Sequence, residues 1–125
     1  MLKKVGKVVC SLAIIGFIGT NIAQAAGSSI AQISSKNINP VGSTVSVNGK
    51  LATAAQNYSG SASFKAMSKK DSWGFDSVIA SSAMSPGDEF YTTNNNQKGN
   101  YYAAAEYTSG GAAYLSGYVS AGQSN

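Results

Sequence analysis

The 125-residue chain contains no histidine and no arginine, and its single cysteine, Cys10, lies close to the N-terminus. Ser-His and Cys-His nucleophile pairs need an imidazole, and zinc sites are built mainly from Cys and His side chains. Neither a Gly-x-Ser-x-Gly elbow nor a Ser-x-x-Lys pair occurs. We therefore expect a protein that is not an enzyme and that holds no cofactor.

Carboxylate chemistry is what remains, and it rests on five acids: Asp71, Asp76, Asp88, Glu89 and Glu106. A glycosidase needs two carboxyl groups about 5 to 9 Å apart across a cleft, but these acids follow turns or lie on outward strand positions, where charge is ordinary. The segment DSWGFD places two aspartates close together, although their spacing matches no standard calcium loop. The sequence therefore predicts no catalytic residue and no metal site.

No apolar run is long enough to cross a bilayer, which takes roughly 20 residues. Instead, Lys3, Lys4 and Lys7 precede a shorter apolar stretch, and small residues follow at Ala23 and Ala25. This pattern is typical of a secretory signal peptide, here residues 1–25, cleaved after Ala25. We expect a secreted protein without a membrane span in its mature form, and without disulfides, because Cys10 leaves with the signal.

Basic charge is also scarce once the signal is removed. The whole chain has nine lysines and five acids, but three of the lysines lie in the predicted signal peptide. The remaining chain is nearly neutral, so the clustered basic surface that nucleic-acid binding requires is absent. The lack of arginine beside abundant Lys, Asn and Ser indicates a bacterial source with an A+T-rich genome.

No window after the signal keeps a helical period of apolar residues, whereas several keep the two-residue period of half-buried strands. The predicted organisation is a flexible leader at 26–42, a domain at 43–120 and a disordered tail at 121–125. We expect an all-β fold, a single small antiparallel β-sandwich or barrel of about six strands, with much of its topology a meander.

Particular strands can be placed from the pattern. Asn48-Gly49 is a hairpin signal, but a two-residue turn there would mix apolar and polar residues on each face. We therefore predict one continuous strand with Val45, Val47 and Leu51 on a buried face and a bulge at Gly49. Strand-like patterns continue through 62–66, 73–84 and 89–93, Pro86-Gly87 predicts a type II turn, and 94–100 is expected to be a loop.

Five tyrosines crowd residues 101–118, where two strands are expected to form a hairpin around Gly110. An odd loop, 109–111, directs Tyr101 and Tyr107 toward the core, whereas an even loop reverses the faces and exposes Leu115. The odd loop gives the more consistent faces. It leaves a flat polar-aromatic strip, our candidate ligand-binding site: Tyr102, Tyr114, Tyr118 and Glu106.

Tyrosine offers flat apolar area at low entropic cost with a hydroxyl that stays in water, so we expect the strip to bind a cell-wall or other extracellular glycan or polymer. Two alternatives stay open, a secreted bacteriocin-like antimicrobial and a self-associating extracellular matrix protein. The lysine cluster Lys65, Lys69 and Lys70 could attract an anionic envelope polymer, and Asn57 begins a formal glycosylation motif. The sequence does not determine the oligomeric state.

Overall fold

The structure is a computed structural model that describes residues 27–124. The predicted signal peptide lies outside these residues. Six strands make up nearly the whole described chain: β1 (Ser28–Ser34), β2 (Val45–Asn57), β3 (Ala62–Lys70), β4 (Ser77–Met84), β5 (Glu89–Gly110) and β6 (Ser116–Ser124). One short 3-10 helix, Ala112–Tyr114, joins β5 to β6. The prediction of an all-β fold is confirmed.

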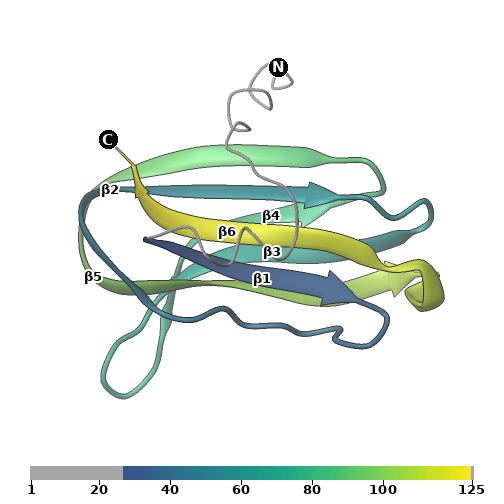
Figure 1. The fold of residues 1–125 in the computed structure, drawn as a ribbon, viewed down its shortest axis with the longest axis horizontal. Helices are drawn as coiled ribbons and strands as arrows, with labels where there is room; N and C mark the ends of the chain where they lie inside the picture. Colours follow the sequence, from purple (N-terminus) through teal and green to yellow (C-terminus); the bar gives the residue numbers. More distant parts are fainter. Residues whose placement is uncertain (1–26, 125) are drawn as a thin grey trace.

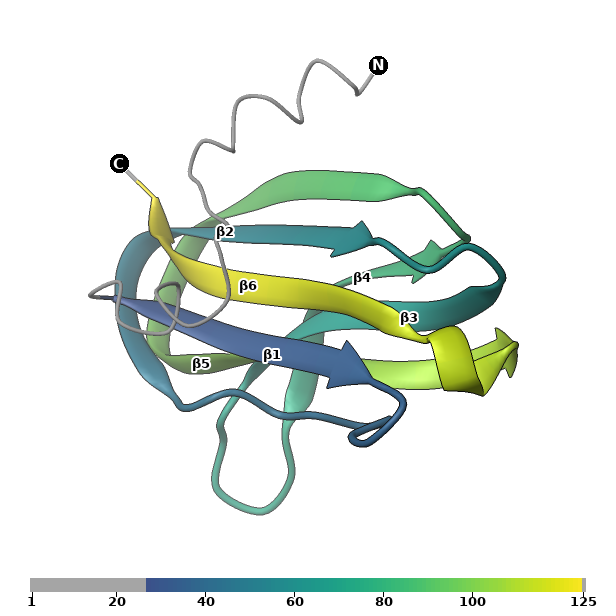
Figure 2. The ribbon, with the colours of Figure 1, turned by 45° about the vertical axis from the view of Figure 1, so that its right-hand side comes forward.

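All six strands belong to one antiparallel sheet with the order β1-β6-β2-β5-β3-β4. The sheet folds over on itself, so that β1 and β6 lie in front of β3 and β4 (Figures 1 and 2). The 22-residue β5 takes part in both layers, because its first half pairs with β2 and its second half with β3.

The main hydrophobic core of the described residues lies between the two layers and receives side chains from every strand. The largest buried side chains include Phe64 on β3, Ile33 on β1 and Tyr101 on β5. Two buried hydroxyl groups, those of Thr53 and Ser68, satisfy each other across 2.9 Å. Along each strand the side chains point alternately inward and outward, and the inward ones share one interior, as the two-residue period predicts.

Strand β2 follows its prediction closely. It runs unbroken through Asn48-Gly49, buries Val47 and Leu51 on the inward face, and half-buries Val45 on the same face. Its register with β5 shifts between Gly49 and Leu51, which is a bulge, and Gly49 adopts a φ of 132° that favours glycine. The rejection of a hairpin turn at this point is confirmed.

The predicted flexible leader at 26–42 is wrong for its described part. Residues 28–34 form β1, which pairs with β6, and Ser29 accepts a hydrogen bond from the Ala103 backbone N–H at 2.9 Å. Residues 38–42 then run alongside β5, and the Gly42 N–H donates to the Ala103 carbonyl oxygen. The pattern was missed because the inward face of β1 carries the small residues Ser29 and Ala31, which weakens the apolar period.

The predicted disordered tail at 121–125 is also wrong through Ser124, because β6 continues to that residue. Ala121 is buried, and the Gln123 amide makes two hydrogen bonds to the backbone of Asn48, at 2.7 and 3.1 Å. The expected loop at 94–100 belongs to β5 as well. At both places the residues are mostly polar, so no apolar period marks a strand. The strands form through backbone pairing with their neighbours.

The predicted meander is mostly wrong, since among the six strands of residues 27–124 only β3 and β4 are consecutive in the chain and also paired. In particular, β5 and β6 do not form a hairpin, because β2 lies between them. The type II turn is better predicted: Gly87 has a φ of 84°, and Asp88 N donates to the Ser85 carbonyl oxygen. Among the described residues no helix has the length and apolar character needed to cross a bilayer.

Candidate functional site

The inward and outward assignment of the final tyrosines is mostly as expected. Tyr101 is fully buried in the core, and Tyr107 packs against it half-buried. Tyr102 lies on the opposite face of β5 but is buried as well, beside Met67 and Ala104. The expected exposure of the Tyr102 ring is therefore wrong, because neighbouring side chains on β3 and β5 cover it.

The Tyr102 hydroxyl donates to Asp76 Oδ2 at 2.5 Å, while the backbone N–H of Ser72 donates to Asp76 Oδ1 at 3.1 Å. Both oxygens of this carboxylate are therefore used within the protein. The Tyr102 hydrogen bond is the main cause that lowers the pKa of Asp76. Burial, followed by the nearby Asp76, raises the pKa of Tyr102 to about 12. The pair closes the base of the β3–β4 loop.

The other members of the predicted strip lie elsewhere. Tyr114 is on the 3-10 helix and 72% exposed, and Glu106 is exposed opposite Lys65 of β3. Strand β2 lies between β5 and β6 and allows their positions to be compared. Tyr118 on β6 pairs with Gln56 near one end of β2, whereas Tyr102 on β5 is level with Thr44, just before the other end. These positions are twelve residues apart on β2, about 40 Å along the strand. The structure does not gather the four predicted residues.

Strand order brings a different set of side chains around Tyr118. One row of paired positions crosses four strands on the outer face, from Gln32 through Tyr118 and Gln56 to Glu89. The next row runs through Ile30, Ser120, Ala54 and Tyr91 in the same way. We call the following residues the tyrosine–glutamine face: Gln32, Gln56, Tyr58, Glu89, Tyr91 and Tyr118.

Two tyrosine rings lie together on this face. The centroids of Tyr58 and Tyr118 are 6.1 Å apart and their planes are tilted by 37°. Tyr58 is 55% exposed and Tyr91 is 37% exposed, while Tyr118 is half-buried. Beside them, Gln56 Nε2 donates to Glu89 Oε2 at 3.4 Å. The arrangement provides aromatic surface edged by amide and carboxylate groups.

The next positions on the outer side of the central strands carry small residues, namely Ala52, Ala54, Ser120 and Gly122. At Gly122 the backbone of Gly27 approaches closely, since a built Cβ would lie 2.4 Å from the Gly27 carbonyl oxygen, so the small-residue part of the face ends there. An extended polymer can lie on such a surface, with its apolar patches against the rings and its hydroxyl groups toward the amides.

Sequence reasoning identified Tyr118 but missed the other five residues of the face. Along β2 and just after it, Ala52, Ala54, Gln56 and Tyr58 alternate with buried residues. This sequence pattern indicates that their side chains face outward. It does not show which strands lie beside β2, and only that neighbourhood joins β1, β5 and β6 into one surface.

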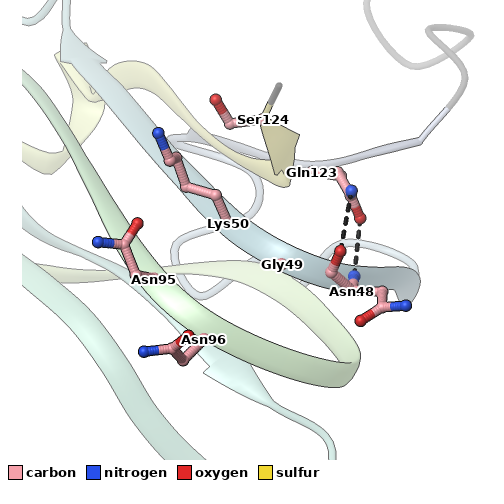
Figure 3. A pocket seen from close by; sticks show the side chains of 7 residues that line it. All are labelled: Asn48, Gly49, Lys50, Asn95, Asn96, Gln123 and Ser124. Atoms are coloured by element: carbon pink, nitrogen blue, oxygen red, sulfur yellow. Dashed lines mark hydrogen bonds between the residues drawn. The ribbon is translucent and has the colours of Figure 1, made fainter.

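A second polar surface lies where β2, β5 and β6 meet, and Figure 3 shows its lining. It is a shallow, open depression lined by Asn48, Gly49, Lys50, Asn95, Asn96, Gln123 and Ser124. The Gln123 amide is already bonded to the Asn48 backbone on both sides. The depression offers hydrogen-bonding groups without an aromatic platform, so it is the weaker candidate.

Within residues 27–124 no group of three or more His, Cys, Asp or Glu side chains is placed to hold a metal ion. The comparisons with known proteins show no match to a protein family and no significantly similar curated protein. Among solved structures, the fold resembles a crystal structure of PirA with a TM-score of 0.45 and 9% identity. That alignment covers 78% of this chain and 94% of the other. A likeness this distant carries no information on function.

Proposed function

We propose that the protein is a secreted, non-catalytic β-sandwich that binds a cell-envelope or other extracellular glycan through the tyrosine–glutamine face. The observation that carries this proposal is the Tyr58–Tyr118 pair, with Tyr118 level with Gln32 and Gln56 on the outer side of adjacent strands. Sugar rings present apolar faces that pack on aromatic rings, and their hydroxyl groups need partners such as amides and carboxylates.

Position in the fold also supports binding. The inward residues of the same strands form the core, so the backbone beneath the face is fixed and little entropy is lost on binding. The tyrosine–glutamine face replaces the predicted strip of Tyr102, Tyr114, Tyr118 and Glu106 as the candidate site. Of that strip only Tyr118 is retained. Tyr114 and Glu106 serve best as controls, because they are exposed elsewhere.

The test is co-sedimentation of the chain from Ala26 onward with insoluble cell walls and insoluble polysaccharides. The double variant Tyr58→Ser, Tyr118→Ser should bind roughly tenfold or more weakly, since stacked aromatic residues dominate interface energies. Tyr114→Ser is the matched control and should bind as the parent does. If the double variant stays folded and sediments equally with every polymer that the parent binds, the tyrosine–glutamine face is not the site.

Self-association is a second candidate function, favoured by the edge strand β4. Its sequence SVIASSAM has no charge, proline or glycine, and natural edges usually carry such residues to prevent pairing. The other edge, β1, is approached closely by Gly42, where a built Cβ would lie 2.8 Å from the Ile30 carbonyl oxygen. Pairing of β4 with β4 of a second copy would therefore give a closed dimer.

Sedimentation velocity tests this second candidate. A dimer that is lost in Ser81→Lys on β4, but kept in Ser120→Lys on β6, would support pairing through this edge. A parent protein that stays monomeric at all concentrations would refute it.

A further inference from the structure

The β3–β4 loop, residues 71–76, carries the two most exposed large apolar side chains in the described chain. Trp73 is 100% exposed and Phe75 is 78% exposed. In both Figures 1 and 2 this loop projects away from the two layers of the sheet. Sequence reasoning placed both residues in a half-buried strand, but β4 begins only at Ser77. Two exposed aromatic rings at one tip need an explanation, because such surface normally marks an interaction.

The loop is held by specific bonds at its base. Asp71 N donates to the Asn100 carbonyl oxygen at 2.8 Å, and Asp76 accepts hydrogen bonds from Ser72 and Tyr102. These contacts tie both ends of the loop to each other and to β5. The aromatic pair is therefore presented outward on a fixed base, and it is not folded back on the core.

Positive charge gathers at the same end of the sheet. Lys69 and Lys70 are the last residues of β3, and the Lys70 ammonium reaches toward Gly99, 3.7 Å from where a Cβ would stand there. Lys98 lies two residues before Asn100, whose carbonyl oxygen accepts the Asp71 N–H at the base of the loop. Lys69, Lys70 and Lys98 outnumber Asp71 and Asp76, so this end has a net charge of +1, while the remaining acids and lysines of residues 27–124 sum to zero.

We propose that this end of the molecule docks on the surface of an anionic lipid bilayer, with Trp73 and Phe75 entering the headgroup boundary. Tryptophan favours that boundary because its ring is apolar and its N–H still meets water. Lysines beside it are attracted to anionic headgroups. A second copy is a poor partner for the tip, because two ends of like charge would repel. This docking is separate from the tyrosine–glutamine face and does not depend on it.

Trp73 is the only tryptophan in the chain, so its fluorescence reports on the tip alone. The chain from Ala26 onward, which contains every strand and the whole described core, is titrated with vesicles of phosphatidylcholine alone or with an equal part of phosphatidylglycerol. We expect a shift to shorter wavelength and protection from a water-soluble quencher with the anionic vesicles. High salt should weaken both effects.

Variants separate the apolar and ionic contributions. Phe75→Ser keeps the reporter and should weaken partitioning about tenfold, because it removes buried apolar area. The double variant Lys69→Gln, Lys70→Gln should weaken it about fivefold for each lysine, the equivalent of ~1 kcal/mol each. Lys36→Gln and Tyr114→Ser, which change a lysine and an aromatic residue at the opposite end, are the matched controls. Thermal unfolding establishes that each variant is folded.

Unchanged Trp73 emission at every concentration of anionic vesicles would overturn the proposal. So would equal partitioning of folded Phe75→Ser and the parent. An emission shift that depends on protein concentration without lipid would assign the tip to a second copy and contradict membrane docking. The double variant Tyr58→Ser, Tyr118→Ser should bind vesicles normally, so failure of the glycan proposal and of this one can be told apart.

Discussion

At the scale of single residues, Asn57 links the β2–β3 connection to the end of β4. Its buried Nδ2 donates to the carbonyl oxygens of Ala62 and Met84, both at 2.9 Å, and its Oδ1 accepts from Ser59 N at 2.8 Å. The glycosylation motif also begins at Asn57, and attachment of a glycan requires this Nδ2 to be free and exposed. Asn57 is therefore a structural residue, and the motif has no accessible acceptor.

We predict that Asn57→Ala lowers the free energy of unfolding by roughly 2 to 4 kcal/mol, because it leaves buried backbone groups without partners. Chemical denaturation measures this change. Asn95→Ala, at an exposed position of β5, is the control and should cost little. A loss below about 0.5 kcal/mol for Asn57→Ala would show that water replaces these bonds.

The bond between Tyr102 and Asp76 gives a pH dependence at both extremes. The pKa of Tyr102 is raised from 10.0 to about 12, so its stabilising effect is complete below pH 10 and disappears as the pH rises through about 12. The pKa of Asp76 is lowered from 3.8, so its effect is present above that value and is lost as the pH falls below it.

Tyr102→Phe should therefore raise the pKa of Asp76 toward its ordinary value, which NMR titration of the carboxyl group would detect. It should also remove this contribution to alkaline unfolding. Tyr101→Phe breaks the hydrogen bond to Gln97 without touching a carboxylate, and should leave the Asp76 titration as it is. An Asp76 pKa that is the same in the parent and in Tyr102→Phe would contradict the described bond.

At the scale of elements, β6 and β3 approach each other closely across the core at Gly117. A Cβ at this position would lie 2.5 Å from the Gln56 carbonyl oxygen and 2.7 Å from Phe64 Cε2. Glycine is required here because the Phe64 ring occupies the space that a side chain would need. The contact fixes the distance between the two layers.

We predict that Gly117→Ala destabilises the fold by about 1 to 3 kcal/mol, the usual cost of overpacking a core. Thermal or chemical unfolding measures it. Gly60→Ala is the matched control, since nothing lies within 4 Å of a Cβ built there. Equal stabilities of the two variants would mean that Phe64 moves aside freely, against the packing described here.

The elements differ in how well the sequence predicts them. Strand β2 is predictable because Val47 and Leu51 alternate with polar residues on a long, regular strand. Strand β1 is not, because Ser29 is held by a hydrogen bond from β5 and not by an apolar pattern. The strand predicted at 73–84 begins too early for the opposite reason: Trp73 and Phe75 have strand propensity, yet they lie exposed in the loop before β4.

At the scale of the whole molecule, strand order decides the candidate site, and nothing local encodes it. Inward and outward parity on β5 and β6 is readable from Ala103, Ala105 and Val119, which are buried as expected. The position of β2 between these strands results from the packing of the complete core. Tyr118 therefore meets Tyr58 and Gln56 from a distant part of the sequence, and not Tyr102 and Glu106.

The molecule thus has two separate candidate surfaces. The tyrosine–glutamine face covers one layer, and the Trp73–Phe75 loop projects from one end of the sheet (Figure 1). A protein that holds an envelope polymer on one surface and a lipid bilayer with another would remain close to a cell boundary. The antimicrobial alternative would add growth inhibition of related strains to these two activities.

Mapping of backbone amide shifts by NMR, while a soluble fragment of the bound wall or polysaccharide is added to the chain from Ala26 onward, tests the central claim most directly. We predict that the affected amides cluster around Gln32, Gln56, Tyr58, Glu89 and Tyr118. The amides of β3 and β4 should stay unchanged. Shifts confined instead to the Asn48–Gln123 depression, or to the outer surface of β3 and β5 around Lys65 and Glu106, would contradict the claim that the tyrosine–glutamine face binds glycan.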